Sequence, residues 1–216
     1  MNATTLPRLQ IVVLEAGLSS RLGRPKGLVT VGSVSLLRRA LILASSLGPY
    51  AVTVVLPPRA SRCRAEIRHL KVAVVDNPER SLGLSTSVRR GIAAARCSGA
   101  VLLLPMDLAV LTRRDLSRLL CRWRSAPRRV IARRLNGLGR SELDSRGSAC
   151  RGSRRSAGAP LILPKWLFAR ARTASGDVGL KDLINALPAE QITLVDLPSA
   201  ELDVDTAADL EAARHR

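Results

Sequence analysis

The sequence predicts an α/β domain with a mostly parallel sheet, and three observations support this prediction. Short apolar runs recur along the chain, and they are continuously apolar rather than alternating, as strands buried on both faces are. Stretches with helical spacing lie between these runs, and strand–helix alternation favours a parallel sheet. Aromatic residues make up only 2% of the chain against 46% hydrophobic residues, so the core must be built from Leu, Val, Ile and Ala.

The predicted elements follow one another in a regular order. We expect strands at residues 11–14, 51–56, 72–76, 100–107, 130–132, 192–197 and 202–205. We expect helices at residues 35–48, 85–96, 113–123, 179–187 and 206–216. Residues 136–158 are rich in Gly, Ser and Arg and lack apolar periodicity, which is typical of a long mobile loop or a disordered insertion. We therefore expect a single domain over residues 1–216 that carries this basic insertion.

The charge of the chain is strongly positive and unevenly spread. Lys and Arg number 35 against 17 Asp and Glu, which gives a formal net charge of +18. Residues 113–155 alone contain fourteen Arg and three acids. Such an excess indicates phosphates, nucleic acid or an acidic membrane as partners, or simply a solvated basic face. The few aromatic residues are scattered and form no platform for stacking bases, so nucleic acid is not the favoured partner.

Cysteine and histidine usage argues against a zinc site. The four Cys form no CxxC pair and there are only two His, so we expect an intracellular, reduced protein. The first ten residues contain no apolar signal core, and no apolar run reaches the roughly 18 residues that span a bilayer. We expect a cytoplasmic protein with no membrane partner.

The loop after the first predicted strand has the composition of a phosphate-binding loop. The strand ends at Leu14, and the loop contains Gly17, Ser19 and Gly23. Ligands of open α/β sheets bind at the carboxyl ends of strands, and glycine lets backbone N–H groups approach phosphate oxygens closely. The pattern is neither GxGxxG nor the P-loop pattern, and an ordinary Gly/Ser turn is the alternative interpretation.

Two basic residues of this loop are candidates for catalysis. Arg21 can contact two phosphate oxygens at once, and Lys26 can place a point charge at the phosphorus under attack. Pro25 stiffens the approach to Lys26.

Three carboxylates are candidates for a metal site. Asp107 ends an apolar strand, and a carboxylate there faces the ligand crevice and is a natural Mg²⁺ ligand. Asp203 and Asp205 alternate on a predicted strand and so share one face. The alternative is that Asp205 and Thr206 cap the last helix, and both roles are compatible, with Asp205 the better ligand candidate.

The stretch LEAGLSSRLGRPKGL at residues 14–28 resembles the signature of the molybdenum-cofactor nucleotidyltransferases, with the closest likeness to the cytidylyltransferase branch. Further segments resemble motifs of that family in the same order. They are residues 77–92, 102–112, 158–168 with 175–184, and 202–210. The likeness covers nearly the whole chain except residues 113–157.

The resemblance implies a Rossmann-like nucleotidyltransferase fold, related to the A-type glycosyltransferases, with helices on both faces of the sheet. It implies Mg²⁺-dependent transfer of a nucleotidyl group from a nucleoside triphosphate to a phosphorylated small molecule of the molybdopterin type. A molybdoenzyme or its chaperone is then a further partner. In the family the residue matching Asp107 binds the metal, and Ala16 favours CTP over GTP.

The resemblance also assigns residues to the nucleotide. Ser85 to Ser87 precede or open a predicted helix and can cap it, and the resemblance adds contacts of the segment 83–87 with base and sugar. Asn77 and Pro78 are expected to form a turn, and residues 158–160 and 176–177 to shape the acceptor side. The nucleotide-binding candidates are Leu14, Ala16, Gly17, Ser19, Gly23, Gly83, Ser85 and Ser87.

The sequence departs from the family pattern at a few positions. Glu15 replaces a usual Ala, and a carboxylate there repels a triphosphate unless it pairs with an Arg or joins the metal shell. Ala109 replaces an expected Pro, and Ala159 replaces a frequent His. Two alternatives therefore remain open. One is the same fold acting on a sugar phosphate or another phosphometabolite, with CTP, GTP or another nucleotide. The other is a non-catalytic basic protein that binds nucleotides, nucleic acid or a partner.

Overall fold

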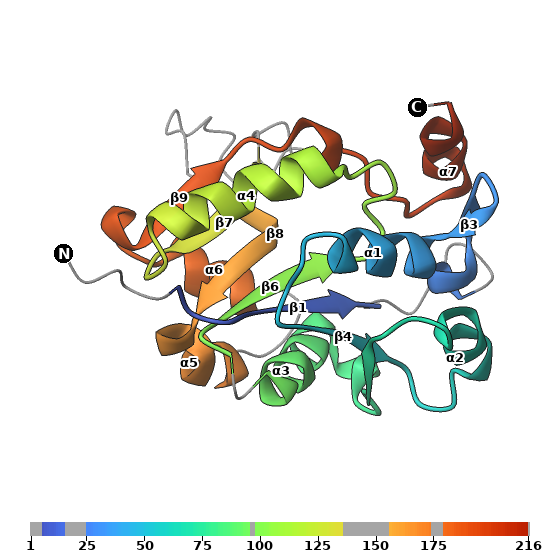
Figure 1. The fold of residues 1–216 in the computed structure, drawn as a ribbon, viewed down its shortest axis with the longest axis horizontal. Helices are drawn as coiled ribbons and strands as arrows, with labels where there is room; N and C mark the ends of the chain where they lie inside the picture. The colour runs from blue at the N-terminus through green and yellow to red at the C-terminus, as the bar shows by residue number, and fades with distance from the viewer. Residues whose placement is uncertain (1–5, 16–24, 96–97, 136–155, 174–178, 216) are drawn as a thin grey trace, which may run out of the picture.

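A seven-stranded sheet forms the centre of the computed structural model, which describes residues 6–15, 25–95, 98–135, 156–173 and 179–215 (Figure 1). The strand order is β5-β4-β1-β6-β8-β7-β9. Neighbouring strands run parallel, except that β8 is antiparallel to both β6 and β7. The bounds are β1 Leu9–Leu14, β4 Ala51–Leu56, β5 Ala73–Asp76, β6 Ala100–Pro105, β7 Val130–Leu135, β8 Ser156–Pro164 and β9 Ile192–Val195. The predicted mostly parallel sheet is confirmed.

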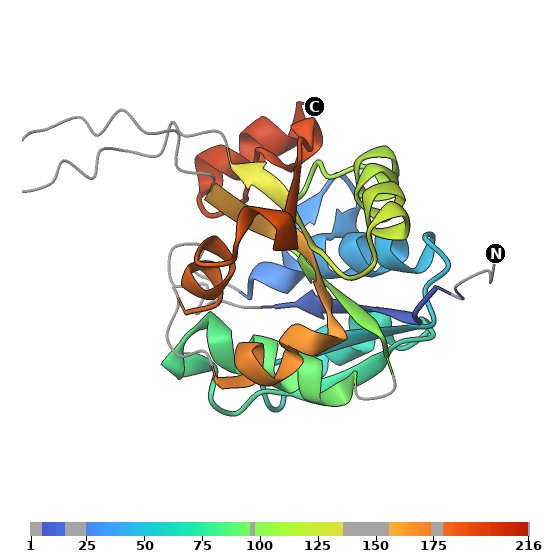
Figure 2. The same ribbon diagram turned by 90° about the vertical axis from the view of Figure 1, so that its left-hand side faces the viewer.

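Helices cover both faces of this sheet. In Figure 1, α1 and α4 lie on one side of the sheet and α3 and α5 on the other, and a quarter turn shows the same layers (Figure 2). The helices are α1 Leu36–Ser45, α2 Ser61–Ile67, α3 Leu84–Ala94, α4 Arg113–Ser125, α5 Phe168–Thr173, α6 Gly179–Asn185 and α7 Ala207–Arg214. None of the helices in the described ranges combines the length and the apolar character needed to cross a membrane.

The continuously apolar strands supply side chains to two separate cores. In β1, Ile11 and Val13 belong to the core under α1, α2 and α4, while Val12 and Leu14 belong to the core over α3, α5 and α6. These four side chains are at most 4% exposed. Since neighbouring residues of a strand point to opposite faces, a strand buried on both sides is apolar at most of its positions.

Short elements complete the fold. The strands β2 Thr30–Val31 and β3 Val34–Ser35 pair in an antiparallel hairpin, and α7 packs beside β2. Five 3-10 turns are η1 Lys26–Leu28, η2 Arg80–Leu82, η3 Lys165–Leu167, η4 Ala189–Gln191 and η5 Pro198–Ala200.

Two predictions about the chain are wrong. Residues 202–205 form no strand; the backbone N–H of Val204 donates to the carbonyl of Asp107 at 3.0 Å, and the helix cap begins two residues later, so no ladder develops. Residues 156–158, predicted to end the loop-like insertion, instead open β8 between β6 and β7. The remaining part of that insertion, residues 136–155, lies outside the described residues.

A close approach between α3 and β1 gives a stability prediction. A Cβ atom on Gly91 would lie 2.4 Å from Val12 Cγ1, and Val12 is fully buried. We expect Gly91→Ala to lower the free energy of unfolding by about 1–3 kcal/mol, because the helix must move off the sheet. Urea denaturation measures this loss.

The double variant Val12→Ala/Gly91→Ala is the matched control. It removes the methyl group that the new Cβ meets, so Gly91→Ala should cost clearly less in the Val12→Ala background. An equal cost in both backgrounds would contradict the assignment to this contact.

Candidate functional site

The Lys26 ammonium lies at the carboxyl edge of the sheet between two carboxylates. Its Nζ is 2.8 Å from Asp107 Oδ2 and 2.6 Å from Asp205 Oδ1. Asp107 follows β6, whose last residue, Pro105, pairs with Leu14 of β1. Lys26 itself opens η1 and is only 6% exposed. The structure therefore brings together three of the predicted residues from positions far apart in the sequence.

Electrostatics keeps this lysine charged. Burial alone disfavours the ammonium, but attraction from Asp107 and hydrogen bonds with Asp107 and Asp205 outweigh it and raise the pKa of Lys26 above its ordinary value. The site thus offers a permanent cation next to two oxygen-donating side chains.

The carboxylate of Asp205 is available because another pair of residues caps the last helix. The Thr206 hydroxyl accepts from the N–H of Asp209, and the Asp209 carboxylate accepts from the N–H groups of Asp205 and Thr206. This is a capping box. The N-cap is Thr206 and not Asp205, so the Asp205 carboxylate is left to contact Lys26.

Asp203 lies within electrostatic range of Asp107, Asp205 and Lys26. Desolvation first, and then repulsion from Asp107, raise the pKa of the Asp203 carboxyl to about 6, while the charge of Arg133 works in the opposite direction. Asp203 is exposed to solvent at the surface of the segment. The charges of Asp107 and of Arg133 on β7 therefore both act on the pKa of the Asp203 carboxyl.

The donor set at the centre fits a hard divalent cation. Asp107 and Asp205 both contact the single atom Nζ of Lys26, so their oxygens lie close together. Mg²⁺ is commonly held by one or two carboxylates, with water and substrate phosphates completing its shell. In the described ranges no group of three or more His, Cys, Asp or Glu is arranged to hold a metal without such added ligands. Asp107 and Asp205 are the residues that would hold the ion.

Glu15, the unusual residue of the loop, is buried beneath η1. It is 5% exposed, its Oε1 lies against Gly27, and Oε2 has no hydrogen-bond partner in the described part of the chain. Desolvation raises the pKa of Glu15, although a hydrogen bond from the Gly27 backbone and the charge of Arg80 oppose this. Burial therefore makes the charged form of Glu15 less favourable than that of a solvated glutamate.

The start of α3 is built by buried polar groups. The N-cap is Gly83, with φ of 102°, a backbone conformation that glycine adopts readily. The helix begins at Leu84, so capping by the hydroxyls of residues 85–87 is wrong. Instead, Asn77 Nδ2 donates to Thr86 Oγ1 at 2.8 Å and to Ser87 Oγ at 2.9 Å.

Asn77 combines two roles at this position. Its Oδ1 accepts from the N–H of Glu79, which confirms the predicted turn, and its amide fixes the first turn of α3. Ser85 and Ser87 are both buried, at 4% and 2% exposure. Their predicted contacts with the nucleotide stay predictions.

Of the other nucleotide candidates, the structure describes Leu14 but not the residues of the loop. Leu14 ends β1 and is 4% exposed, as predicted for the last residue of a buried strand. The catalytic candidate Arg21 and the loop residues Ala16, Gly17, Ser19 and Gly23 lie outside the described residues.

Sequence reasoning missed Arg133, which lies near the end of β7 and is half-buried. The one signal for it was its position directly after the apolar run at 130–132.

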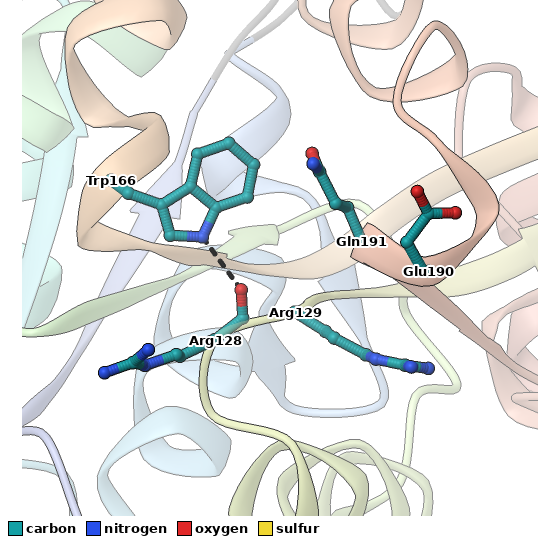
Figure 3. Close-up of a pocket in the computed structure, with 5 residues that line it drawn as sticks. All are labelled: Arg128, Arg129, Trp166, Glu190 and Gln191. Carbon is teal, nitrogen blue, oxygen red and sulfur yellow. Dashed lines mark hydrogen bonds between the residues drawn. The ribbon is translucent and has the colours of Figure 1, made fainter.

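A hollow of about 360 Å³ lies at the amino ends of β7 and β9, away from Lys26 (Figure 3). There Trp166 Nε1 donates to the carbonyl of Arg128 at 2.8 Å, and the Arg128 and Arg129 side chains extend away from each other.

Known proteins share the sequence pattern and the fold of this chain. Residues 11–192 match the family described as MobA-like NTP transferase domain. Nicotine blue oxidoreductase from Paenarthrobacter nicotinovorans is 30% identical over 213 residues, which cover 95% of this chain and 96% of that protein.

Solved structures confirm the predicted fold. The structure of Rv0371c from Mycobacterium tuberculosis has a TM-score of 0.74 at 24% identity and covers 98% of this chain and 100% of that chain. Rv0371c in complex with manganese has a TM-score of 0.70 at 23% identity, with 98% and 100% covered. 4-diphosphocytidyl-2C-methyl-D-erythritol synthase from Anaerococcus prevotii has a TM-score of 0.74 at 13% identity, with 96% and 95% covered.

The raised pKa of Glu15 gives a prediction about stability and pH. The unfolded chain ionises Glu15 near pH 4.5, whereas the native state holds the proton to higher pH, so Glu15 costs stability as pH rises above that value. Glu15→Gln keeps an oxygen that can accept from Gly27 and carries no charge. We expect its melting temperature to exceed that of the wild type by a margin that grows from pH 4 to pH 7.

The exposed carboxyl of Glu190 gives the control. Glu190→Gln makes the same change in net charge away from the site, and its margin over the wild type should stay nearly constant with pH. A Glu15→Gln margin that shrinks as pH rises would mean that Glu15 is ionised and paired in the native protein.

Proposed function

This chain belongs to the MobA-like NTP transferase family, and we propose that it transfers a cytidylyl group from CTP to the phosphate of a molybdopterin-type acceptor, with release of pyrophosphate. Family membership makes the chain a nucleotidyltransferase. The choice of CTP, of a molybdopterin-type acceptor and of the metal ion is proposed.

One observation carries the proposal: the buried Lys26 ammonium held between Asp107 and Asp205 at the carboxyl edge of the sheet. Nucleotidyl transfer moves a strongly anionic group and relies on positioning and electrostatic stabilisation rather than a covalent intermediate. A fixed cation and two metal-binding carboxylates at one point are what such a reaction needs.

The chain's own residues would divide the work as follows. Lys26 would contact a non-bridging oxygen of the α-phosphate and stabilise the negative charge that grows there. The predicted role of Arg21 is to hold the leaving pyrophosphate by two oxygens. The acceptor's phosphate oxygen attacks in line with that leaving group, and a phosphate nucleophile requires no general base.

A divalent ion would be held by Asp107 and Asp205, and when bound it supplies a Lewis acid that neutralises the triphosphate. The manganese complex of Rv0371c supports a divalent metal for a structurally similar protein. We propose Mg²⁺ as the ion used by this chain.

A second acceptor class is favoured by one comparison. The Anaerococcus neighbour is named as a diphosphocytidyl-methylerythritol synthase, which indicates CTP chemistry on a small phosphometabolite in the same fold. A sugar phosphate or a similar phosphomonoester is therefore the alternative acceptor.

Further parts of the proposal concern the chain as a whole. We propose a single domain over residues 1–216, a cytoplasmic location, and delivery of the product to a molybdoenzyme or its chaperone. The nucleotide contacts of residues 14–23 and 83–87 belong to the same proposal.

Pyrophosphate release is the direct test. Purified protein is mixed with CTP, GTP, ATP or UTP, with Mg²⁺ or Mn²⁺, and with molybdopterin or a panel of phosphomonoesters. We expect pyrophosphate with CTP and molybdopterin, and a loss of kcat of at least about 100-fold in Lys26→Met and Asp107→Asn. The panel also includes NADH and NADPH, because the Paenarthrobacter relative is named as an oxidoreductase.

Two exposed residues away from the cluster provide matched controls: Lys165→Met for the lysine variant and Glu211→Gln for the carboxylate variant. Both should keep wild-type rates, and melting curves check that all variants fold. No pyrophosphate from any nucleotide, or oxidation of NADH in its place, would overturn the proposal.

A further inference from the structure

A hollow of about 340 Å³ lies at the carboxyl end of β7. Its walls are the end of that strand and the segment after β9, with lining residues Arg133, Arg134, Leu135, Asp196, Leu197, Pro198 and Glu201. This volume is in the range of small-molecule sites. The hollow is separate from the one shown in Figure 3, which lies at the amino ends of β7 and β9.

The two arginines of the hollow are in different electrostatic situations. Arg134 Nε is 2.9 Å from Asp196 Oδ1, so both charges of that pair are compensated. Arg133 is half-buried and forms no ion pair within 4.0 Å of a carboxylate in the described part of the chain. A partly desolvated guanidinium with no carboxylate at ion-pair distance is a site for an anion.

The strand pairing is irregular at Arg133. The register between β7 and β8 shifts between Ala132 and Arg133, and irregularities of this kind re-aim a side chain, often next to active sites. The segment that walls the hollow ends at Glu201, and Asp203 and Asp205 follow it directly along the chain. The hollow and the cluster of Lys26, Asp107 and Asp205 therefore adjoin the same segment.

The arrangement of the strands at the carboxyl end of the sheet leaves the side of β7 and β9 for a second substrate. The predicted phosphate loop follows β1, and Gly83 opens α3 on the side of β1, β4 and β5. A triphosphate bound there occupies that half of the edge, so a second reactant must reach Lys26 from the half formed by β6, β8, β7 and β9.

We propose that this hollow binds the phosphate of the acceptor, with Arg133 as the residue that contacts it. The ligand class is a phosphomonoester, whose dianion can accept two parallel hydrogen bonds from one guanidinium. Glu201 on the facing wall is exposed, so solvent screens its charge. The inference rests on the proposed function where it identifies the bound phosphate as that of the acceptor. Binding of an anion at this site can be tested without turnover.

The test measures binding of inorganic phosphate by ³¹P NMR titration, without nucleotide and again with a saturating non-hydrolysable CTP analogue and Mg²⁺. Arg133→Met should raise the Kd for phosphate about tenfold or more, and Arg133→Lys, which keeps the charge, should lie between the two. Arg129→Met, an exposed arginine at the other end of the same strand region, should stay within about twofold of the wild type.

Two results would overturn the inference: an unchanged Kd in Arg133→Met, or an equal loss in Arg129→Met, which would show a diffuse effect of basic charge. CTP binding on the same variants separates the two proposals. Failure of the wild type to bind CTP counts against the proposed function and leaves the phosphate result standing. If both hold, Arg133→Met raises KM for the acceptor and leaves KM for CTP unchanged.

Discussion

The buried ion cluster of Lys26, Asp107 and Asp205 is the interaction on which the site depends. Lys26 comes from the turn after the first loop, Asp107 from the end of β6, and Asp205 from the segment before α7. A buried charge without partners would cost several kcal/mol, and here two carboxylates supply the compensation. The hydrogen bond from Val204 to Asp107 holds the two acidic segments against each other. Without the lysine, these segments would bring like charges together with nothing between them.

The sheet delivers these residues to one edge. Parallel strands β1, β4, β6, β7 and β9 all end there, and the antiparallel strand β8 begins there, since Ser156 pairs with Leu135. Reversal of a single strand therefore adds the start of β8 to an edge otherwise made of strand ends. The edge then divides into two halves around Lys26, one beside the predicted phosphate loop and one beside Arg133. A reaction between two phosphorylated substrates needs such a division.

The sequence was most informative where a local pattern determines the structure. Strands buried on both faces are apolar at most positions, so β1, β4 and β6 were predictable, and Asp107 followed from its place after one of them. The segment 202–205 looked like a strand, but the N–H of Val204 donates to the carbonyl of Asp107 in a loop and the N–H of Asp205 donates to the Asp209 carboxylate of the helix cap. The position of Arg133 depends on contacts between distant segments, and the bonds of Asn77 to Thr86 and Ser87 join side chains across a turn, and periodicity reveals neither. The resemblance to nucleotidyltransferases supplied the reaction class, which no pattern of apolar residues contains.

The cluster also suggests an order of events in the proposed reaction. One ammonium and two carboxylates leave a net negative charge, and a free triphosphate would meet repulsion at that point. The Asp205 side chain is 56% exposed, so it can release Lys26 at little cost, whereas Asp107 at 22% is held more firmly. Carboxylate oxygens are better partners for a hard divalent cation than for an ammonium, and Lys26 would then be free to turn toward phosphate oxygens. The triphosphate therefore enters most favourably as its metal complex, which brings the charge that the two carboxylates need and lets the lysine change partners.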